Sequence, residues 1–158
     1  YSTAINAGRE KAPAAICRKV AMAEDGGEVE VWGDGQQSRS FCYIDDCLEG
    51  IYRLTQSDHT EPLNIGSDEL VTINELTDMV ADIAGKDLEK KHLLDKPQGV
   101  RGRNSHNGKI KDTLGWAPSV PLRKGMEKTY KWIEEQVENA GPYDKGDGNI
   151  ATEPGASL

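Results

Sequence analysis

The sequence has few cysteines, no excess of positive charge and no long apolar run. Its 158 residues carry a formal net charge of −8 and a pI near 4.9. Nucleic acids and anionic membranes are bound through basic surfaces, so this balance argues against both as partners. A membrane-spanning helix needs about 20 consecutive apolar residues, and no run approaches that length. The N-terminus also lacks a charged-then-apolar leader. We therefore expect a cytoplasmic protein.

The three cysteines, Cys17, Cys42 and Cys47, are too few and too scattered for a disulfide framework. They form no CxxC pair and no histidine lies at ligand spacing, so no metal site is predicted. We interpret them as buried or half-buried thiols in a reducing compartment. The 17 glycines fall mostly in turn-like clusters, which is typical of a loop-rich α/β protein.

Hydrophobic periodicity predicts an alternation of helices and short strands. Helices are expected over 13–24, from Asp45 onward, over 72–85, around 110–114 and from 122; strands are expected over 28–32, 40–44, 62–66 and 88–94. Thr72 and Glu75 have the spacing of a capping box, and Gly85 is the natural end of that helix. We interpret Asp45 and Asp46 as helix caps rather than as an acid/base pair. Residues 1–141 are predicted to form one unit and 142–158 a flexible tail.

Several short motifs follow one another in a specific order. They are Trp32-Gly33-Asp34-Gly35, the stretch from Arg39 to Asp46, Asn64-Ile65-Gly66, Arg101-Gly102-Arg103 and Leu114-Gly115-Trp116-Ala117-Pro118. In this order they resemble the C-terminal half of the extended short-chain dehydrogenase/reductase (SDR) family, the NAD-dependent nucleotide-sugar epimerases and dehydratases. The resemblance implies an α/β fold: the C-terminal substrate-binding portion of an NAD(P)-binding Rossmann-type fold, with the main Rossmann half missing.

One branch of this family fits best. The stretch from Gly8 to Ala15 (GREKAPAA) and Cys17-Arg18-Lys19 resemble members that epimerise a GDP-linked sugar at carbons 3 and 5. The resemblance covers roughly residues 8–138. It implies a GDP-sugar substrate, a bound NAD and a homodimer, with oxidation of carbon 4 before the epimerisation and reduction after it. His106 departs from the family pattern, which has Asp there, and this predicts a weaker cap for the following helix.

Two arginines are the candidates for holding the diphosphate of the substrate. Guanidinium groups stay charged and bind phosphate oxygens in a planar fork. Arg39 and Arg103, expected on separate loops, resemble the diphosphate-contacting pair of the family; the alternative is two solvated surface arginines. By the same resemblance Gln37 and Ser38 line the nucleotide-sugar site. Lys19 resembles a nucleotide-contacting lysine, and its alternative is a solvent-facing helix residue.

Lys11 is the candidate catalytic residue. Epimerisation beside a carbonyl needs a base on one face of the carbon and an acid on the other. The family resemblance at Glu10-Lys11-Ala12 gives Lys11 the part of the acid and places all three residues at the substrate. A lysine near arginines and partly desolvated would have a lowered pKa, which suits this role. The alternative is an ordinary lysine before a helix.

The sequence lacks the parts that would hold and use NAD. It has no Gly-rich dinucleotide-binding turn, and no tyrosine is followed four residues later by lysine. We therefore expect no cofactor-binding residues in this chain, no catalysis by the chain alone, and exposed apolar surface where the Rossmann half would pack. Two alternatives stay open: another NAD-dependent sugar epimerase or 4,6-dehydratase, and a non-catalytic truncated binding module.

Overall fold

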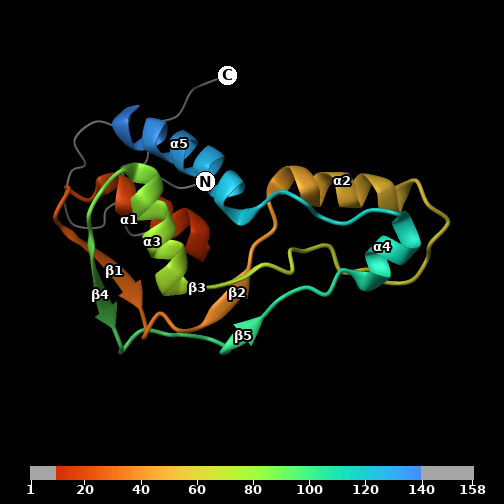
Figure 1. The fold of residues 1–158 in the computed structure, drawn as a ribbon, viewed down its shortest axis with the longest axis horizontal. Helices are drawn as coiled ribbons and strands as arrows, with labels where there is room; N and C mark the ends of the chain where they lie inside the picture. Colours follow the sequence, from red (N-terminus) through yellow and green to blue (C-terminus); the bar gives the residue numbers. More distant parts are fainter. Residues whose placement is uncertain (1–9, 140–158) are drawn as a thin grey trace, which may run out of the picture.

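The computed structural model describes residues 10–139 (Figure 1). The elements in chain order are α1 (Ala12–Met22), β1 (Glu28–Trp32), β2 (Ser38–Ser40), α2 (Ile44–Thr55), β3 (Leu70–Thr72), α3 (Ile73–Ala84), β4 (Glu89–Leu93), β5 (Gly102–Arg103), α4 (Gly108–Leu114) and α5 (Leu122–Asn139). The predicted α/β composition is confirmed. Gly8 and Arg9 of the GREKAPAA stretch and the expected tail over 142–158 lie outside the described residues.

The main core lies where α1, α3 and α5 pack against one another and α1 packs on β1. Strands β1 and β4 form a parallel pair in which Glu28 lies opposite Glu89 and Trp32 opposite Leu93. The apolar side chains that face inward are fully or nearly fully buried: Cys17, Val20, Val29, Val31, Leu76, Val80, Met126, Tyr130 and Ile133. The apolar stripe predicted for the last helix is therefore confirmed, and its burial provides most of the packing energy of α5.

A second sheet of three short strands has the order β3-β2-β5. Strand β2 pairs with β3 antiparallel, with Ser38 opposite Thr72, and with β5 parallel, with Arg39 opposite Arg103. The strand predicted over 40–44 is thus misplaced, since β2 ends at Ser40 and helix α2 already begins at Ile44. Phe41 and Tyr43 lie in the connection between them, where the chain turns from the sheet into the helix.

No strand forms over 62–66, contrary to prediction. Ile65 and Trp116 instead both approach Gly50 on α2, where a Cβ would lie within 3 Å of each side chain. The backbone nearby is held by isolated bonds, from the Ser105 N–H to the Ser67 carbonyl (3.2 Å) and from the Lys109 ammonium to the Pro62 carbonyl (3.0 Å), rather than by a ladder. The apolar side chain of Ile65 therefore serves packing here and not sheet formation.

Helices α2 and α4 lie at the opposite end of the molecule from α1 (Figure 1). Neither Asp45 nor Asp46 caps α2: Tyr43 occupies the N-cap without a side-chain hydrogen bond. The Asp46 carboxylate accepts hydrogen bonds from the N–H groups of Ser119 (2.8 Å) and Val120 (2.7 Å), and so fixes the segment before α5. An apolar face of α2 is exposed in the described structure, formed by Ile44, Leu48, Ile51 and Tyr52. That the Rossmann half packs on such a surface stays a prediction.

The helix ends of α3 agree with the sequence. The Thr72 hydroxyl accepts from the Glu75 N–H (3.1 Å), the Glu75 carboxylate accepts from the Thr72 N–H (2.7 Å), and Gly85 takes a left-handed conformation at the C-cap. Helix α4 begins at Gly108, two residues after His106, and its N-cap residue Asn107 makes no side-chain cap bond. Cys17 is buried and Cys42 and Cys47 are half-buried, as predicted. Across residues 10–139, no helix has the length and apolarity needed to cross a membrane.

Candidate functional site

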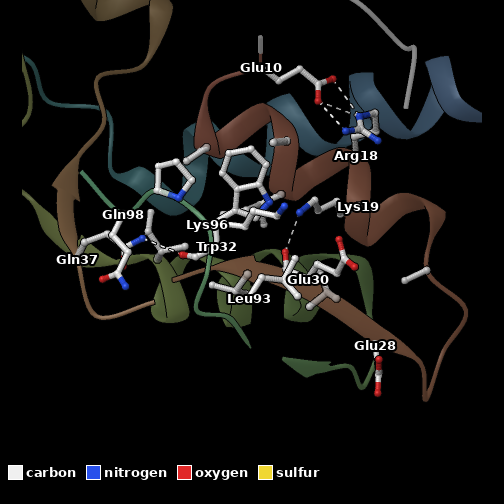
Figure 2. Close-up of a pocket in the computed structure, with 18 of the residues that line it drawn as sticks. Glu10, Arg18, Lys19, Glu28, Glu30, Trp32, Gln37, Leu93, Lys96 and Gln98 are labelled. Carbon is white, nitrogen blue, oxygen red and sulfur yellow. Dashed lines mark hydrogen bonds and ion pairs between the residues drawn. The ribbon is translucent and has the colours of Figure 1, made fainter. Parts of the chain in front are cut away.

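A pocket of about 780 Å³ opens between α1, β1 and the segment that follows β4. The predicted site residues Glu10, Ala12, Lys19, Gln37 and Arg39 line it. Figure 2 shows Lys19 pointing from α1 toward β1, with Trp32 and Lys96 beside it. The structure therefore brings together five of the residues that the sequence assigned to the substrate site, from two segments of the chain.

Lys19 is fixed between a carbonyl and an aromatic ring. Its ammonium donates to the Glu30 carbonyl (2.8 Å) and lies 6.0 Å from the ring centroid of Trp32, whose side chain is half-exposed. Burial lowers the pKa of Lys19 and the positive charge of Arg18 lowers it further, while the charges of Glu30 and Glu10 oppose the shift. A cation next to an open aromatic face offers both charge and a stacking surface to a ligand.

Gln37 brings an unpaired acceptor to the pocket wall. The residue is only 6% exposed, and its Nε2 donates to the Trp32 carbonyl (3.1 Å). Among residues 10–139, its buried Oε1 has no hydrogen-bond partner. Gln37 therefore contributes to the pocket wall through its packing and its bond to Trp32.

Arg39 and Arg103 are neighbours rather than residues of separate loops. They are register partners on the parallel strands β2 and β5, so their side chains leave the same face of the sheet. The Arg39 Nη1 donates to the Ser38 carbonyl (2.7 Å), and its guanidinium borders Gly99. Arg103 is exposed and lies outside the pocket lining. Guanidinium groups that leave the same face of a sheet are suited to binding a multiply charged anion.

Ser38 lies between the two pocket residues Gln37 and Arg39 but serves the sheet. Its N–H donates to the Arg101 carbonyl (2.8 Å), and its hydroxyl also reaches that oxygen (3.4 Å). Ser38 therefore attaches β2 to the segment that leads into β5.

The two residues before α1, Glu10 and Lys11, have different surroundings. The Glu10 carboxylate is held by Arg18 in a largely buried ion pair, with Nε and Nη2 contacts of 2.7–3.0 Å. Lys11 is the N-cap residue of α1, and its side chain is exposed and absent from the pocket lining. The partial desolvation predicted for Lys11 is not found among the described residues, because nothing there covers the start of α1.

Sequence reasoning missed several residues of the pocket. Arg18, Trp32, Lys96 and Gln98 line it without having been assigned to it. Trp32 belongs to the same motif as Gly33-Asp34-Gly35, so its position just before the turn was an available signal. Lys96 and Gln98 come from the loop after β4, and only the parallel pairing of β4 with β1 brings them to the pocket.

The residues of this chain do not fit NAD. A dinucleotide needs a Gly-rich turn between a strand and a helix N-terminus, and the sequence has no such turn. The strand that precedes α3 is followed instead by a Thr72–Glu75 capping box, which occupies the helix N–H groups that a phosphate would use.

Comparisons with known proteins agree with the geometry. The profile of the family described as GDP-mannose 4,6 dehydratase matches residues 5–129. GDP-mannose 3,5-epimerase of Arabidopsis thaliana is 55% identical over 131 residues, which cover 83% of this chain and 34% of that protein. GDP-mannose 3,5-epimerase 1 of Oryza sativa subsp. japonica is 53% identical with the same coverage.

Solved structures of nucleotide-sugar epimerases also align with most of this chain and with part of their own length. UDP-glucose 4-epimerase from Thermotoga maritima, solved with UDP-glucose, aligns with a TM-score of 0.75 and 27% identity over 83% of this chain and 41% of that one. UDP-glucuronic acid 4-epimerase from Bacillus cereus, in complex with UDP-glucuronic acid and NAD, aligns with a TM-score of 0.63 and 30% identity. The alignment covers 69% of this chain and 36% of that one. The fold is thus an α/β arrangement that matches part of extended SDR structures.

The chain belongs to the GDP-mannose 4,6 dehydratase family, within the NAD-dependent nucleotide-sugar epimerases and dehydratases. The resemblance seen in the ordered motifs is therefore confirmed. Inside that family the chain is homologous to GDP-mannose 3,5-epimerase, the branch indicated by the GREKAPAA stretch, and it spans about a third of the length of these curated relatives.

Proposed function

We propose that this chain is the C-terminal, substrate-binding portion of a GDP-mannose 3,5-epimerase, and that its site binds the GDP moiety of the sugar nucleotide. The observation that carries the proposal is the pairing of Arg39 with Arg103 across β2 and β5. A nucleotide diphosphate carries at least two negative charges, which a pair of guanidinium groups can bind in bidentate fashion.

The rest of the site supplies what the nucleoside needs. Trp32 and Lys19 offer an aromatic face and a cation, and Gln37 forms part of the wall beside them. Ser38 holds β2 in place, and the Arg18 ion pair holds Glu10 at the pocket wall. These contacts come from α1, β1 and β2, while Arg103 is brought to them by the pairing of β5 with β2.

In the intact enzyme, GDP-mannose would be converted to GDP-L-galactose by oxidation at carbon 4, epimerisation at carbons 3 and 5, and reduction at carbon 4. Lys11 would give its proton to the carbon after a base on the opposite face has removed one. Residues outside this chain would hold NAD for the oxidation and reduction of the sugar at carbon 4. This chain alone would therefore not catalyse the reaction. The homodimer implied by the family stays a prediction.

The proposal is tested by titrating the chain with GDP-mannose in a calorimeter. Substituting either arginine, Arg39→Gln or Arg103→Gln, removes a charge-assisted contact of about 1.5–3 kcal/mol, so affinity should fall roughly 10- to 100-fold. Arg123→Gln is the matched control, since Arg123 is exposed on α5 and engaged with Asp82 and Glu127. Equal affinity of all three variants would refute the proposed site.

A related enzyme acting on another nucleotide sugar is the second candidate, because structures aligned with this chain hold UDP-sugars. Competition between GDP-mannose and UDP-glucose for the chain separates the two. Stronger binding of GDP-mannose supports the epimerase assignment, and stronger binding of UDP-glucose supports the alternative.

A further inference from the structure

Little backbone pairing holds the strand that carries Arg103. The β2–β5 ladder consists of two register pairs, Ser38 with Gly102 and Arg39 with Arg103. Gly102 and Arg103 are both exposed. Two-residue pairing at an exposed edge is weak, since an isolated strand pair is marginal in water. Something else must keep Arg103 opposite Arg39 if the two are to act as one site.

Asp34 makes that connection from the turn between β1 and β2. Its Oδ2 accepts from the Nη1 of Arg101 (2.9 Å), directly before β5. The Arg101 carbonyl in turn accepts from the N–H of Ser38 at the start of β2 (2.8 Å). Arg101 is therefore held at both its side chain and its backbone, and the residue two positions later is Arg103.

The turn that carries Asp34 is itself anchored. Asn74 on α3 donates from Nδ2 to the Asp34 carbonyl (3.1 Å) and from its backbone N–H to the Gly35 carbonyl (3.0 Å). Gly35 has φ +69, and a Cβ there would lie 2.0 Å from the Asn74 Oδ1, so only glycine permits this approach. The Gln36 N–H donates to Asp34 Oδ1 (2.9 Å) and, with Arg101, lowers the pKa of Asp34.

We propose that Asp34 is a positioning residue for the anion site: through Arg101 it holds β5 against β2, so that Arg103 stays opposite Arg39. The inference rests on the proposed function, because it concerns the same two arginines. Among the described residues Asp34 is not part of the pocket lining, so in this inference it acts through Arg101.

The sign of the effect separates positioning from simple electrostatics. Asp34 is a negative charge near a site for an anion, so its removal by Asp34→Asn should strengthen anion binding if only charge mattered. Positioning predicts the opposite. Because an exposed ion pair contributes little, the affinity for GDP should fall only modestly, by up to about fivefold. The asparagine retains an oxygen for the Gln36 N–H, which preserves the turn.

Asp82→Asn is the matched control. Asp82 also pairs with an exposed arginine, Arg123 (2.5 Å), but on the contact between α3 and α5. The substitution changes the net charge by the same amount, and we expect no loss of GDP affinity. A double-mutant cycle completes the test: in an Arg101→Gln background, Asp34→Asn should cause no further loss, because the contact is already gone.

GDP titration of the chain and its variants gives distinct outcomes. Weaker binding by Asp34→Asn, unchanged binding by Asp82→Asn and non-additivity with Arg101→Gln support the inference. Unchanged or stronger binding by Asp34→Asn, with loss in Arg103→Gln, overturns the inference and leaves the proposed function standing. No loss in Arg103→Gln overturns the proposed function and the inference with it.

A second readout does not need a ligand. The Ser38 N–H is bound to the Arg101 carbonyl, so amide hydrogen exchange at Ser38 reports whether the two segments stay together. Exchange should accelerate in Asp34→Asn and stay unchanged in Asp82→Asn. Equal exchange in the two variants would overturn the inference independently of any binding result.

Discussion

Replacing Lys86 by methionine should destabilise the C-terminal end of α1 and lower the stability of the fold. Lys86 directly follows the C-cap residue of α3. Its ammonium donates to the carbonyls of Val20 (2.9 Å), Ala21 (3.0 Å) and Ala23 (2.7 Å). These are carbonyls of the last helical turn, where a cation also interacts favourably with the helix dipole. Lys86 therefore joins α1 to α3 across more than 60 residues of sequence.

The size of the loss follows from these contacts. A hydrogen bond to a charged group contributes about 1.5–3 kcal/mol, and the dipole adds about 0.3–1 kcal/mol. One ammonium shares the three carbonyls, and the half-buried site lets water replace part of the bonding. We therefore expect Lys86→Met to cost about 2 kcal/mol, not the sum of three bonds. At about 2–4 °C per kcal/mol, Tm should fall by roughly 4–8 °C.

Urea unfolding followed by circular dichroism measures this loss. The control is Lys109→Met, because Lys109 is exposed and donates to one carbonyl, that of Pro62 (3.0 Å). Its loss should stay below about 0.5 kcal/mol. If the two variants lost the same stability, the bonds of Lys86 at the end of α1 would contribute no more than one exposed contact, and the reasoning would be refuted.

Two further predictions concern α3 and α2. The N–H and the hydroxyl of Thr72 lower the pKa of Glu75. The stability that the Glu75 carboxylate contributes is therefore complete above the unfolded-state pKa of about 4.3 and is lost as pH falls through the lower folded-state pKa. The difference in unfolding free energy between the wild type and Glu75→Gln should shrink from pH 7 to pH 3. Leu48 on α2 is 57% exposed and Leu76 is fully buried, so Leu48→Ser should leave the urea midpoint unchanged and reduce binding of a hydrophobic dye, whereas Leu76→Ala should cost about 2–5 kcal/mol. A pH-independent Glu75 effect, or equal losses at the two leucines, would contradict these readings.

The sequence predicted elements whose signals are local. The capping box and Gly85 belong to α3 and the apolar stripe belongs to α5, and each signal is contained within its own helix, so it could be recognised without knowing the fold. The pattern over 40–44 failed because alternating apolar residues also occur where a strand runs directly into a helix. Backbone partners decide such cases, and they come from distant parts of the chain.

In the candidate site, too, local motifs were recognised from the sequence, but pairing between distant segments was not. Motif resemblance named Gln37, Arg39 and Arg103, but it placed the arginines on separate loops, because pairing between β2 and β5 spans more than 60 residues. Burial was the least predictable property. It was expected at Lys11 and is found at Lys19, whose surroundings come from β1 and not from neighbouring sequence.

The central claim is that β2 and β5 together bind the diphosphate of a nucleotide sugar. The most direct test is a nuclear magnetic resonance titration of the 15N-labelled chain with GDP and, separately, with guanosine. We predict saturable shifts at the amides of 37–40 and 102–103 with GDP, and binding of guanosine at least about tenfold weaker, since it lacks the charge-assisted contacts. Equal affinity for the two compounds, or shifts confined to other parts of the chain, would contradict the account.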